Sequence, residues 1–291
     1  MNNNLYYKKY LKYKKKYLNL KKQLGGNNNC INLTYDDVMK GIDDGKYSYA
    51  ELQLSNYRKL LINIGSDKKY CGSGAFKKVY LGVDIKNNKL IAWHEIGLEG
   101  TKLYWKRFIN EIKAMEKLDH PNVLKFFGSS YLSEGYKLVI LTELINGGEL
   151  LDIISKKILN NSMIAFYLKQ ILEGLKYIHS NNIIHRDIKS DNIMVDNNNT
   201  IKIIDLGLAT YVVPDEDELA AEKKGATKEG DQPPTMMRQP SVDSKARTEG
   251  KNNPMGTPEF MAPEITSGYY NQLDDIYSLG MILGQMIFRE N

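Results

Sequence analysis

The sequence predicts an α+β fold with two lobes, in which a small strand-rich lobe precedes a larger helical lobe. Short apolar runs bounded by Gly and Asn fill residues 64–97 and 137–144, as expected for strands. Apolar residues at helical spacing follow at 161–180, and a segment that is hydrophobic nearly all round a helix spans 274–288. With 291 residues, of which 42% are hydrophobic, the chain can bury a sizeable core.

The chain divides into four parts. Residues 1–26 form a basic amphipathic helix or tail, and residues 27–63 are interpreted as linker and lead-in. Residues 64–145 form the small lobe with the hinge that follows it, and residues 146–291 form the large lobe. Within the large lobe, residues 212–254 are charged, polar and rich in proline, which predicts a disordered insertion.

The elements of the small lobe follow from local signals. Residues 70–84 are expected to form a hairpin, with a glycine turn between two apolar strands. Asn87 and Asn88 predict a turn before a buried strand at 91–96, and residues 137–144 predict another buried strand. Residues 105–122 have the spacing of an amphipathic helix that ends between Asp119 and Asn122.

Two helices dominate the large lobe. The helix at 161–180 is expected to be capped by Asn161 and Ser162. Its predicted buried stripe consists of Ile164, Leu168, Ile171, Leu172, Leu175 and Ile178. The helix at 274–288 is hydrophobic nearly all round, which is typical of a buried helix.

Charge is unevenly distributed along the chain. Residues 1–26 carry eight lysines and no acidic residue, whereas the remainder has 32 basic and 35 acidic residues. The body of the protein therefore lacks the charge expected for nucleic-acid binding. No apolar run approaches the ~20 residues that a membrane helix needs, and no secretory signal is visible. Cys30 and Cys71 form no CxxC pair, which favours two reduced thiols in an intracellular protein.

The basic tail has an apolar face, formed by Tyr6, Tyr10, Tyr13, Tyr17, Leu20 and Leu24. Such a helix could dock on a partner, bind an anionic surface, serve as a processed address, or simply solubilise the chain. The segment resembles a Tyr/Lys/Leu segment ending in Gly-Gly that opens many giant-virus proteins. That resemblance implies a viral protein, located in the cytoplasm of an infected host cell or in the virion.

Three motifs occur in a fixed order in the large lobe. IIHRDIKSDNIMV spans 183–195, IKIIDLGLAT spans 201–210, and GTPEFMAPE spans 256–264. The order H-R-D-x-K-x-x-N, then D-x-G, then A-P-E resembles the protein kinases over about residues 64–291. The resemblance implies a two-lobed kinase fold that uses ATP and Mg²⁺ and phosphorylates a Ser or Thr hydroxyl of a protein substrate.

The same resemblance implies roles for individual residues. Asp187 would accept the proton of the substrate hydroxyl, and Lys189 would steady the transferring phosphate. Asn192 and Asp205 would bind magnesium. Thr257 together with Lys189 implies a serine/threonine kinase, Asp275 would anchor the catalytic loop, and Arg186 suggests control by a phosphate on the activation segment.

One expected lysine is missing. His94 stands in IAWHEI where the third-strand lysine of V-A-I-K belongs, and Lys77 replaces the third glycine of the loop CGSGAFKKV. This arrangement resembles the with-no-lysine (WNK) kinases, which take the phosphate-binding lysine from the glycine loop. It implies that Lys77 holds the ATP phosphates and that Glu111 is its ion-pair partner. The nucleotide contacts that it implies are Gly72, Ser73, Gly74, Lys77, Val79, Ala92, Thr142, Glu143 and Leu144.

The sequence also departs from that family. His94 is bulkier than the family's cysteine, and both a pH-dependent role and a packed neutral imidazole are open for it. WNK kinases bind chloride at the DLGL turn, which Gly207 and Leu208 match, so chloride inhibition is a hypothesis that fails if activity is flat when chloride is exchanged for gluconate. Kinases continue for several helices beyond the one at 274–288, so the large lobe is expected to be truncated.

These observations leave three functions open. The first is a working serine/threonine kinase of WNK type. The second is a catalytically weak pseudokinase or truncated kinase fragment that binds nucleotide or a partner kinase; the intact Asp187, Asn192 and Asp205 argue against it, and His94 argues for it. The third is an interaction protein in which the tail carries the function.

Overall fold

The computed structural model describes residues 34–45, 48–54, 57–63, 72–73, 77–97, 102–132, 137–156, 158–212, 246–247, 256–267 and 269–288. The predicted tail helix, Gly74 and nearly all of the predicted insertion lie outside the described residues. The chain forms two compact units, of which the first comprises residues up to 106 with 124–147, and the second comprises 107–123 with 148 onward. Two units agree with the two predicted lobes, but residues 107–123, predicted as part of the small lobe, belong to the second unit.

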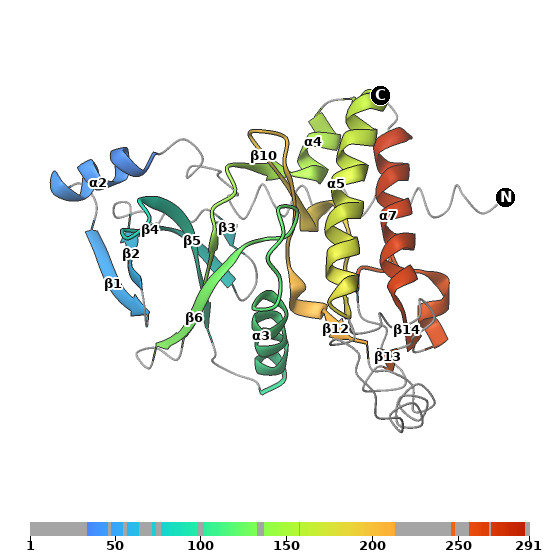
Figure 1. The fold of residues 1–291 in the computed structure, drawn as a ribbon, viewed down its shortest axis with the longest axis horizontal. Coiled ribbons are helices and arrows are strands. Elements are labelled where there is room, and N and C mark those ends of the chain that lie inside the picture. Colours follow the sequence, from blue (N-terminus) through green and yellow to red (C-terminus); the bar gives the residue numbers. More distant parts are fainter. Residues whose placement is uncertain are drawn as a thin grey trace, which may run out of the picture. The chain divides into compact units, whose positions relative to one another are not determined.

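The first unit is built on one antiparallel sheet (Figure 1). Its strands are β1 (Ser48–Leu54), β2 (Tyr57–Asn63), β3 (Gly72–Ser73), β4 (Lys77–Asp84), β5 (Lys89–Gly97), β6 (Phe126–Leu132) and β7 (Lys137–Glu143). They are paired in the order β1-β2-β4-β5-β7-β6, and β3 pairs with β4. The predicted glycine hairpin and the strands at 91–96 and 137–144 are therefore all present.

The register of β4 and β5 decides which side chains share a face. Val79 lies opposite His94, Leu81 lies opposite Ala92, and Ala92 in turn lies opposite Thr142 of β7. Side chains alternate along a strand, so these residues share one face of the sheet. The other face carries a separate buried cluster of Tyr80, Ile91, Trp93, Val139 and Leu141.

Residues 34–63 differ from the predicted linker and lead-in. They form the helix α2 (Tyr35–Asp43), followed by β1 and β2, and β2 joins the sheet through Lys59–Leu61 of its own strand and Gly82–Asp84 of β4. Val38 of α2 packs on Leu81 and Val83. The sequence does not predict these strands because the pairing between β2 and β4 joins segments that are distant in the chain.

The second unit is mainly helical. Its helices are α4 (Leu150–Lys156), α5 (Asn161–Ser180) and α7 (Gln272–Ile287), together with the C-terminal part of α3 (Lys102–Met115). Short strands β8 (Gly147–Glu149), β10 (Ile193–Asp196) and β11 (Ile201–Ile203) form a small sheet. Two further pairs join β9 (Ile183–Ile184) to β12 (Thr210–Tyr211), and β13 (Ala246–Arg247) to β14 (Tyr269–Tyr270). The pair β13–β14 places two residues of the predicted insertion in a strand.

Two helix boundaries differ from the prediction. Asn160, not Asn161 or Ser162, caps α5, because its side chain accepts a hydrogen bond from the backbone N–H of Met163. The helix α3 ends at Met115, several residues before Asp119. The buried stripe of α5 contains Tyr167 and Gly174 in addition to Ile164, Ile171, Leu175 and Ile178, whereas Leu172 is exposed.

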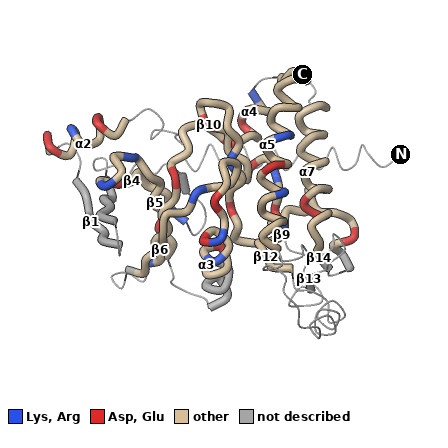
Figure 2. The backbone as a smooth tube through the Cα atoms, viewed as in Figure 1, with Lys and Arg blue, Asp and Glu red and all other residues tan. Residues whose placement is uncertain are grey.

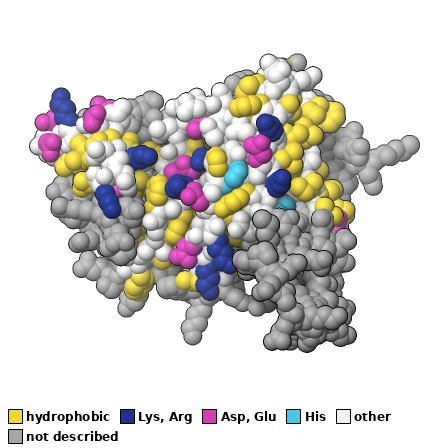
Figure 3. All heavy atoms as spheres, viewed as in Figure 1, with side chains coloured by type: hydrophobic (Ala, Val, Ile, Leu, Met, Phe, Trp, Pro, Cys, Tyr) yellow, Lys and Arg dark blue, Asp and Glu magenta, His cyan; other side chains and the backbone are white. Residues whose placement is uncertain are grey.

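The helix α7 is buried on one face only. Ile282 and Leu279 are buried, and α7 lies beside α5 in the core of the unit (Figure 1). The opposite face exposes large apolar side chains, namely Leu273, Ile276, Tyr277, Met281, Ile287 and Phe288. Hydrophobic side chains accordingly gather along α7 in the space-filling view (Figure 3). Within the part of the chain that the structure describes, no helix is both long and apolar enough to cross a membrane.

Candidate active site

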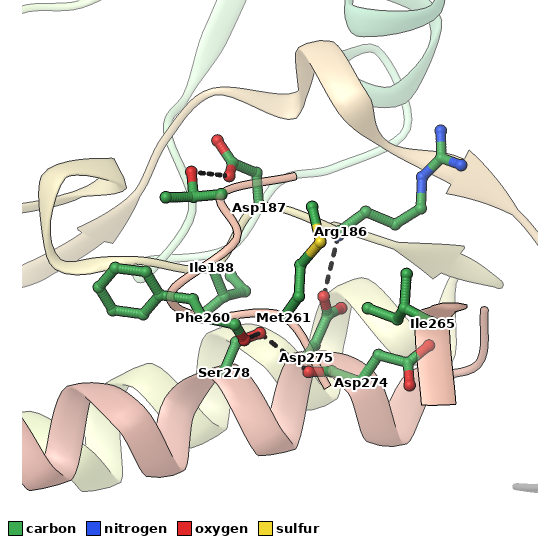
Figure 4. Close-up of a pocket in the computed structure, with 10 residues that line it drawn as sticks. Arg186, Asp187, Ile188, Phe260, Met261, Ile265, Asp274, Asp275 and Ser278 are labelled. Carbon is green, nitrogen blue, oxygen red and sulfur yellow. Dashed lines mark hydrogen bonds between the residues drawn. The ribbon is translucent and has the colours of Figure 1, made fainter. Parts of the chain in front are cut away.

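The loop that contains H-R-D, residues 185–192, is called the HRD loop below. One buried carboxylate of α7 holds it in place. Asp275 accepts hydrogen bonds from the backbone N–H of His185 at 2.9 Å and from His179 Nε2 at 2.8 Å. It also accepts a hydrogen bond from the backbone N–H of Arg186 at 2.9 Å (Figure 4). Burial alone would raise the pKa of Asp275, but the hydrogen bond and charge of His179 outweigh it, so the pKa is lowered. The anchor therefore stays ionised.

Arg186 adopts a left-handed backbone conformation, with φ of 65°. Such a conformation is costly for a residue other than glycine and persists only where the surroundings enforce it. Besides its backbone contact with Asp275, Arg186 donates from Nε to the carbonyl oxygen of Leu208 at 2.6 Å and lies over the ring of Tyr270, 5.0 Å from its centroid. Through Arg186, the HRD loop thus contacts both Leu208 and Tyr270, which lie near the two ends of the segment between the DLGL turn and α7.

Gly256 brings the GTPEF segment against this loop. Its φ is 126°, and a Cβ atom at this position would lie 2.6 Å from the carbonyl oxygen of Arg186. Only glycine fits there without displacement of the backbone. The next residue, Thr257, consequently lies beside Asp187.

Asp187 is the centre of a dense polar network. Its Oδ1 accepts from Thr257 Oγ1 at 2.6 Å, and its Oδ2 accepts from Lys189 Nζ at 2.8 Å and from Asn192 Nδ2 at 2.9 Å. Lys189 Nζ also donates to Thr257 Oγ1 at 2.9 Å. Three predicted residues from two distant segments therefore converge on the carboxylate of Asp187.

The ionisation of Asp187 follows from these contacts. Burial would raise its pKa, but the positive charge and hydrogen bond of Lys189 and the hydrogen bond from Thr257 together lower the pKa below its usual value. Asp187 is an acceptor-only carboxylate at neutral pH as a result. It can accept a proton from a hydroxyl group that arrives within hydrogen-bonding distance.

Asn192 and Asp205 are brought close by backbone pairing. The N–H of Ile204, one residue before Asp205, donates to the carbonyl oxygen of Asn192 at 3.0 Å. Asp205 is exposed and left-handed, with φ of 65°, and its Oδ1 accepts from the N–H of Gly207. The amide nitrogen of Asn192 is used by Asp187, which leaves Asn192 Oδ1 as the oxygen for a ligand. Two oxygen donors with room for water fit Mg²⁺, which seldom takes an all-protein cage.

Glu111 of α3 lies beside the DLGL turn. The residue is 4% exposed, and a Cβ atom built on Gly207 would lie 3.8 Å from Glu111 Oε2. A further contact lies just beyond the end of α3, where Lys117 Nζ is 4.3 Å from the centroid of the Tyr211 ring. The structure therefore places the predicted Glu111 against the turn that contains Asp205.

In the first unit, the predicted Lys77 and His94 share one sheet face. Val79 lies opposite His94, and Lys77 is two residues further along the same strand, so the two side chains are diagonal neighbours. Lys78 points to the other face. His94 is buried, and its Nε2 lies 2.9 Å from Thr142 Oγ1.

The pKa of His94 is well below its usual value. Burial is the main cause, and the positive charge of Lys77 acts in the same direction. Of the two alternatives that the sequence leaves open, the structure therefore favours a packed neutral imidazole at neutral pH. The side chain cannot supply the positive charge of the missing lysine.

A small cavity lies beneath the GTPEF segment (Figure 4). Its lining includes Arg186, Phe260, Met261, Asp274 and Ser278. Asp274 accepts a hydrogen bond from the N–H of Asn271 through Oδ2, but its Oδ1 is buried and has no hydrogen-bond partner within the described ranges. Burial and the nearby charges of Glu264 and Asp275 raise the pKa of Asp274 to about 6.

Comparison with known proteins agrees with this geometry. Residues 66–291 match the protein kinase domain family. The chain belongs to the protein kinase family. A MAP kinase kinase kinase of Saccharomyces cerevisiae, SSK2, is 32% identical over 76% of this kinase and 14% of its own length.

Other relatives of this kinase carry the WNK name. Serine/threonine-protein kinase WNK3 of Mus musculus is 32% identical over 75% of the chain and 11% of its own length. Serine/threonine-protein kinase WNK8 of Arabidopsis thaliana is 34% identical over 74% of the chain and 34% of its own length. The kinase thus spans from about a tenth to a third of the length of these relatives.

The described residues of the kinase contain most of the predicted site. Asp187, Lys189, Asn192, Asp205 and Glu111 lie in the second unit, and Lys77, Val79, Ala92, Thr142 and Glu143 lie in the first. Gly72 and Ser73 form β3, opposite Val79 and Lys78, and Leu144 packs in the cluster around Val38. No cluster of three or more His, Cys, Asp or Glu side chains suited to a metal occurs in the described part of the kinase.

Sequence reasoning missed the contact between His94 and Thr142 and the unpartnered oxygen of Asp274. The first depends on the register between β5 and β7, two strands that are 48 residues apart at this contact. The second had a visible signal, because the paired Asp274 and Asp275 open an otherwise uncharged helix (Figure 2).

Proposed function

We propose that this kinase transfers the γ-phosphate of ATP to serine or threonine hydroxyls of a protein substrate. The observation that carries the proposal is the network at Asp187, in which Lys189, Asn192 and Thr257 all contact one ionised carboxylate. Asp187 accepts the proton of the hydroxyl, whose oxygen bonds to the γ-phosphorus as the bond to the β–γ bridging oxygen breaks. Lys189 is the cation beside the transferring group.

We assign the phosphate-binding lysine to Lys77. The face that Lys77 shares with His94 also carries Val79 and Ala92, which the proposal assigns to the nucleotide. Lys78 lies on the opposite face of β4, and His94 is neutral, so neither can take over this charge. Asn192 Oδ1 and Asp205 would hold Mg²⁺, which neutralises phosphate charge when bound.

Two contacts at the DLGL turn disfavour the chloride sensitivity that the WNK resemblance implies. The N–H of Gly207, a donor for such an anion, already donates to Asp205 Oδ1 at 3.2 Å. Glu111 Oε2 is a second negative group near this glycine. Both features disfavour an anion in this conformation, and equal activity in chloride and gluconate would remove the idea.

Transfer of labelled γ-phosphate from Mg-ATP to a generic basic protein tests the proposal. Lys77→Met should lower the rate about 100-fold, because one stabilising charge at the phosphates is lost. Asp187→Asn should lower it by about 10²- to 10⁴-fold. Lys78→Met is the matched control and should retain the activity of the intact chain, since its side chain lies on the other face.

Two outcomes would overturn the proposal in different ways. No transfer by the intact chain, with retained nucleotide binding, would favour the pseudokinase, for which the histidine at position 94 already argues. Equal losses in Lys77→Met and Lys78→Met would show that the loss is not specific to Lys77 and would overturn its assignment as the phosphate-binding lysine.

A further inference from the structure

His94 has an unused hydrogen-bonding atom. Its Nε2 contacts Thr142 Oγ1, but its Nδ1 is buried and has no partner among the residues that the structure describes. The residue as a whole is only 8% exposed. A buried polar atom without a partner is costly and calls for a physical explanation.

The neighbours of His94 decide which ring nitrogen carries the proton. The hydroxyl of Thr142 lies 3.1 Å from the carbonyl oxygen of Glu143 and donates to it. The oxygen of that hydroxyl is then free to accept, so His94 Nε2 is the donor. Nδ1 of the neutral ring consequently carries a lone pair and is an acceptor. The nearby positive charge of Lys77 favours the same tautomer.

Lys77 is the cation that can reach this acceptor. The two residues are diagonal neighbours on one sheet face, where separations of about 7–8 Å are within reach of a long side chain. The ion pair between Glu95 of β5 and Lys137 of β7, at 3.0 Å, lies on the opposite face. A hydrogen bond from an ammonium group to a neutral acceptor is charge-assisted, and the buried location strengthens it.

We propose that His94 is a positioning residue for the phosphate-binding lysine: its Nδ1 accepts an N–H of Lys77 and holds the ammonium group over the nucleotide face, while its Nε2–H fixes Thr142. The inference rests on the proposed function of Lys77. In this kinase, His94 stands where other kinases have the third-strand lysine, and it thus orients Lys77, the lysine that takes over that role.

Three substitutions separate the two ring nitrogens. The amide of His94→Asn ends near the position of Nδ1 and keeps an acceptor there, but it cannot reach Thr142. The longer amide of His94→Gln reaches the position of Nε2 and keeps the donor to Thr142, but it leaves no acceptor for Lys77. His94→Leu fills a similar volume and removes both hydrogen bonds.

The measurement is kcat/KM for Mg-ATP, with thermal unfolding of every variant as a check on folding. His94→Gln and His94→Leu should lose about threefold to tenfold, the effect of one hydrogen bond, whereas His94→Asn should stay within about twofold of the intact chain. Equal kcat/KM in Asn and Gln variants of equal stability would overturn the inference, and so would loss in His94→Asn alone.

The Lys77→Met background keeps this test separate from that of the proposed function. There the Asn and Gln variants should have equal kcat/KM, because the proposed donor is absent. A difference that persists without Lys77 contradicts the positioning role. If Lys77→Met itself is as active as the intact chain, the proposed function of Lys77 fails, whatever the result at position 94.

Discussion

The HRD loop and the sheet face that carries Lys77 and His94 position their polar side chains in opposite ways. Around the HRD loop, Asp275 and Asp187 each accept three hydrogen bonds, and Gly256 leaves no space beside the carbonyl oxygen of Arg186. On the sheet face, the described contacts of His94 reduce to one hydrogen bond with Thr142. Several hydrogen-bond partners therefore fix each carboxylate around the HRD loop. On the sheet face, the register between strands sets which side chains are neighbours.

This difference bears on the proposed relocation of the phosphate-binding lysine. A lysine on β4 and a lysine on β5 can serve the same face, because register makes positions 77 and 94 diagonal neighbours. No such exchange is open to Asp187, whose partners come from the HRD loop itself and from the GTPEF segment. Where strand register sets the positions of side chains, a lysine at either of two positions can serve the same face. Where several side chains converge on one carboxylate, as at Asp187, the carboxylate cannot be moved to another position.

The largest expected effect on stability comes from replacing Asp275, the carboxylate that anchors the HRD loop. Asp275→Asn keeps the shape but places an amide next to three donors, so we expect a loss of about 3–5 kcal/mol in the free energy of unfolding. Urea unfolding measures this loss. Asp36→Asn in the first turn of α2 is an exposed control that should change stability little. A loss below about 1 kcal/mol for Asp275→Asn would contradict the anchoring role.

Asp274, next to this anchor, should show the opposite sign. Its pKa is raised to about 6 from 3.8, so its ionised form destabilises the folded protein at neutral pH. Asp274→Asn keeps an acceptor for the N–H of Asn271 and should increase the free energy of unfolding at pH 7 by about 1–3 kcal/mol. The stability that protonated Asp274 contributes is complete below pH 3.8 and is lost as pH rises through about 6.

Urea unfolding of the intact chain and Asp274→Asn, at several pH values between 4 and 8, checks this sign. Asp37 is the matched control, because it has the same capping-box position in α2 that Asp274 has in α7. The pKa of Asp37 is lowered, chiefly by its hydrogen bonds with Thr34, so Asp37→Asn should give no gain at neutral pH. A gain of equal size in both variants would show that the buried oxygen of Asp274 is not the cause.

Alanine substitutions at two glycines, Gly256 and Gly280, should change stability in opposite directions. Gly256→Ala places a methyl group against the carbonyl oxygen of Arg186 at a positive φ, so we expect it to lower stability by about 1–3 kcal/mol. Gly280→Ala in α7 meets open space and should raise stability by about 0.5–1 kcal/mol. Thermal unfolding of both variants checks the two signs, and two changes of the same sign would contradict the crowding beside Arg186.

The sequence predicts which side chains meet within the HRD loop better than it predicts contacts between distant segments. Asp187, Lys189 and Asn192 meet within one short loop, so their spacing already implies their proximity. In contrast, the partner of His94 depends on strand register, and the exposure of Leu172 depends on how α5 packs. The sequence also places the cap of α5 at Asn161 and Ser162, whereas the hydrogen bond from the Met163 N–H shows that Asn160 is the cap.

The neutral imidazole of His94 also has a consequence for ligand chemistry. In a kinase with a third-strand lysine, a small molecule that extends past Thr142 meets an ammonium group and gains from carrying an acceptor or an anion. Here β5 offers only a buried neutral imidazole whose Nδ1 is assigned to Lys77, so the charge that a compound meets comes from β4. Selectivity between this kinase and one with a third-strand lysine should therefore depend on the direction from which an acidic group of the compound approaches.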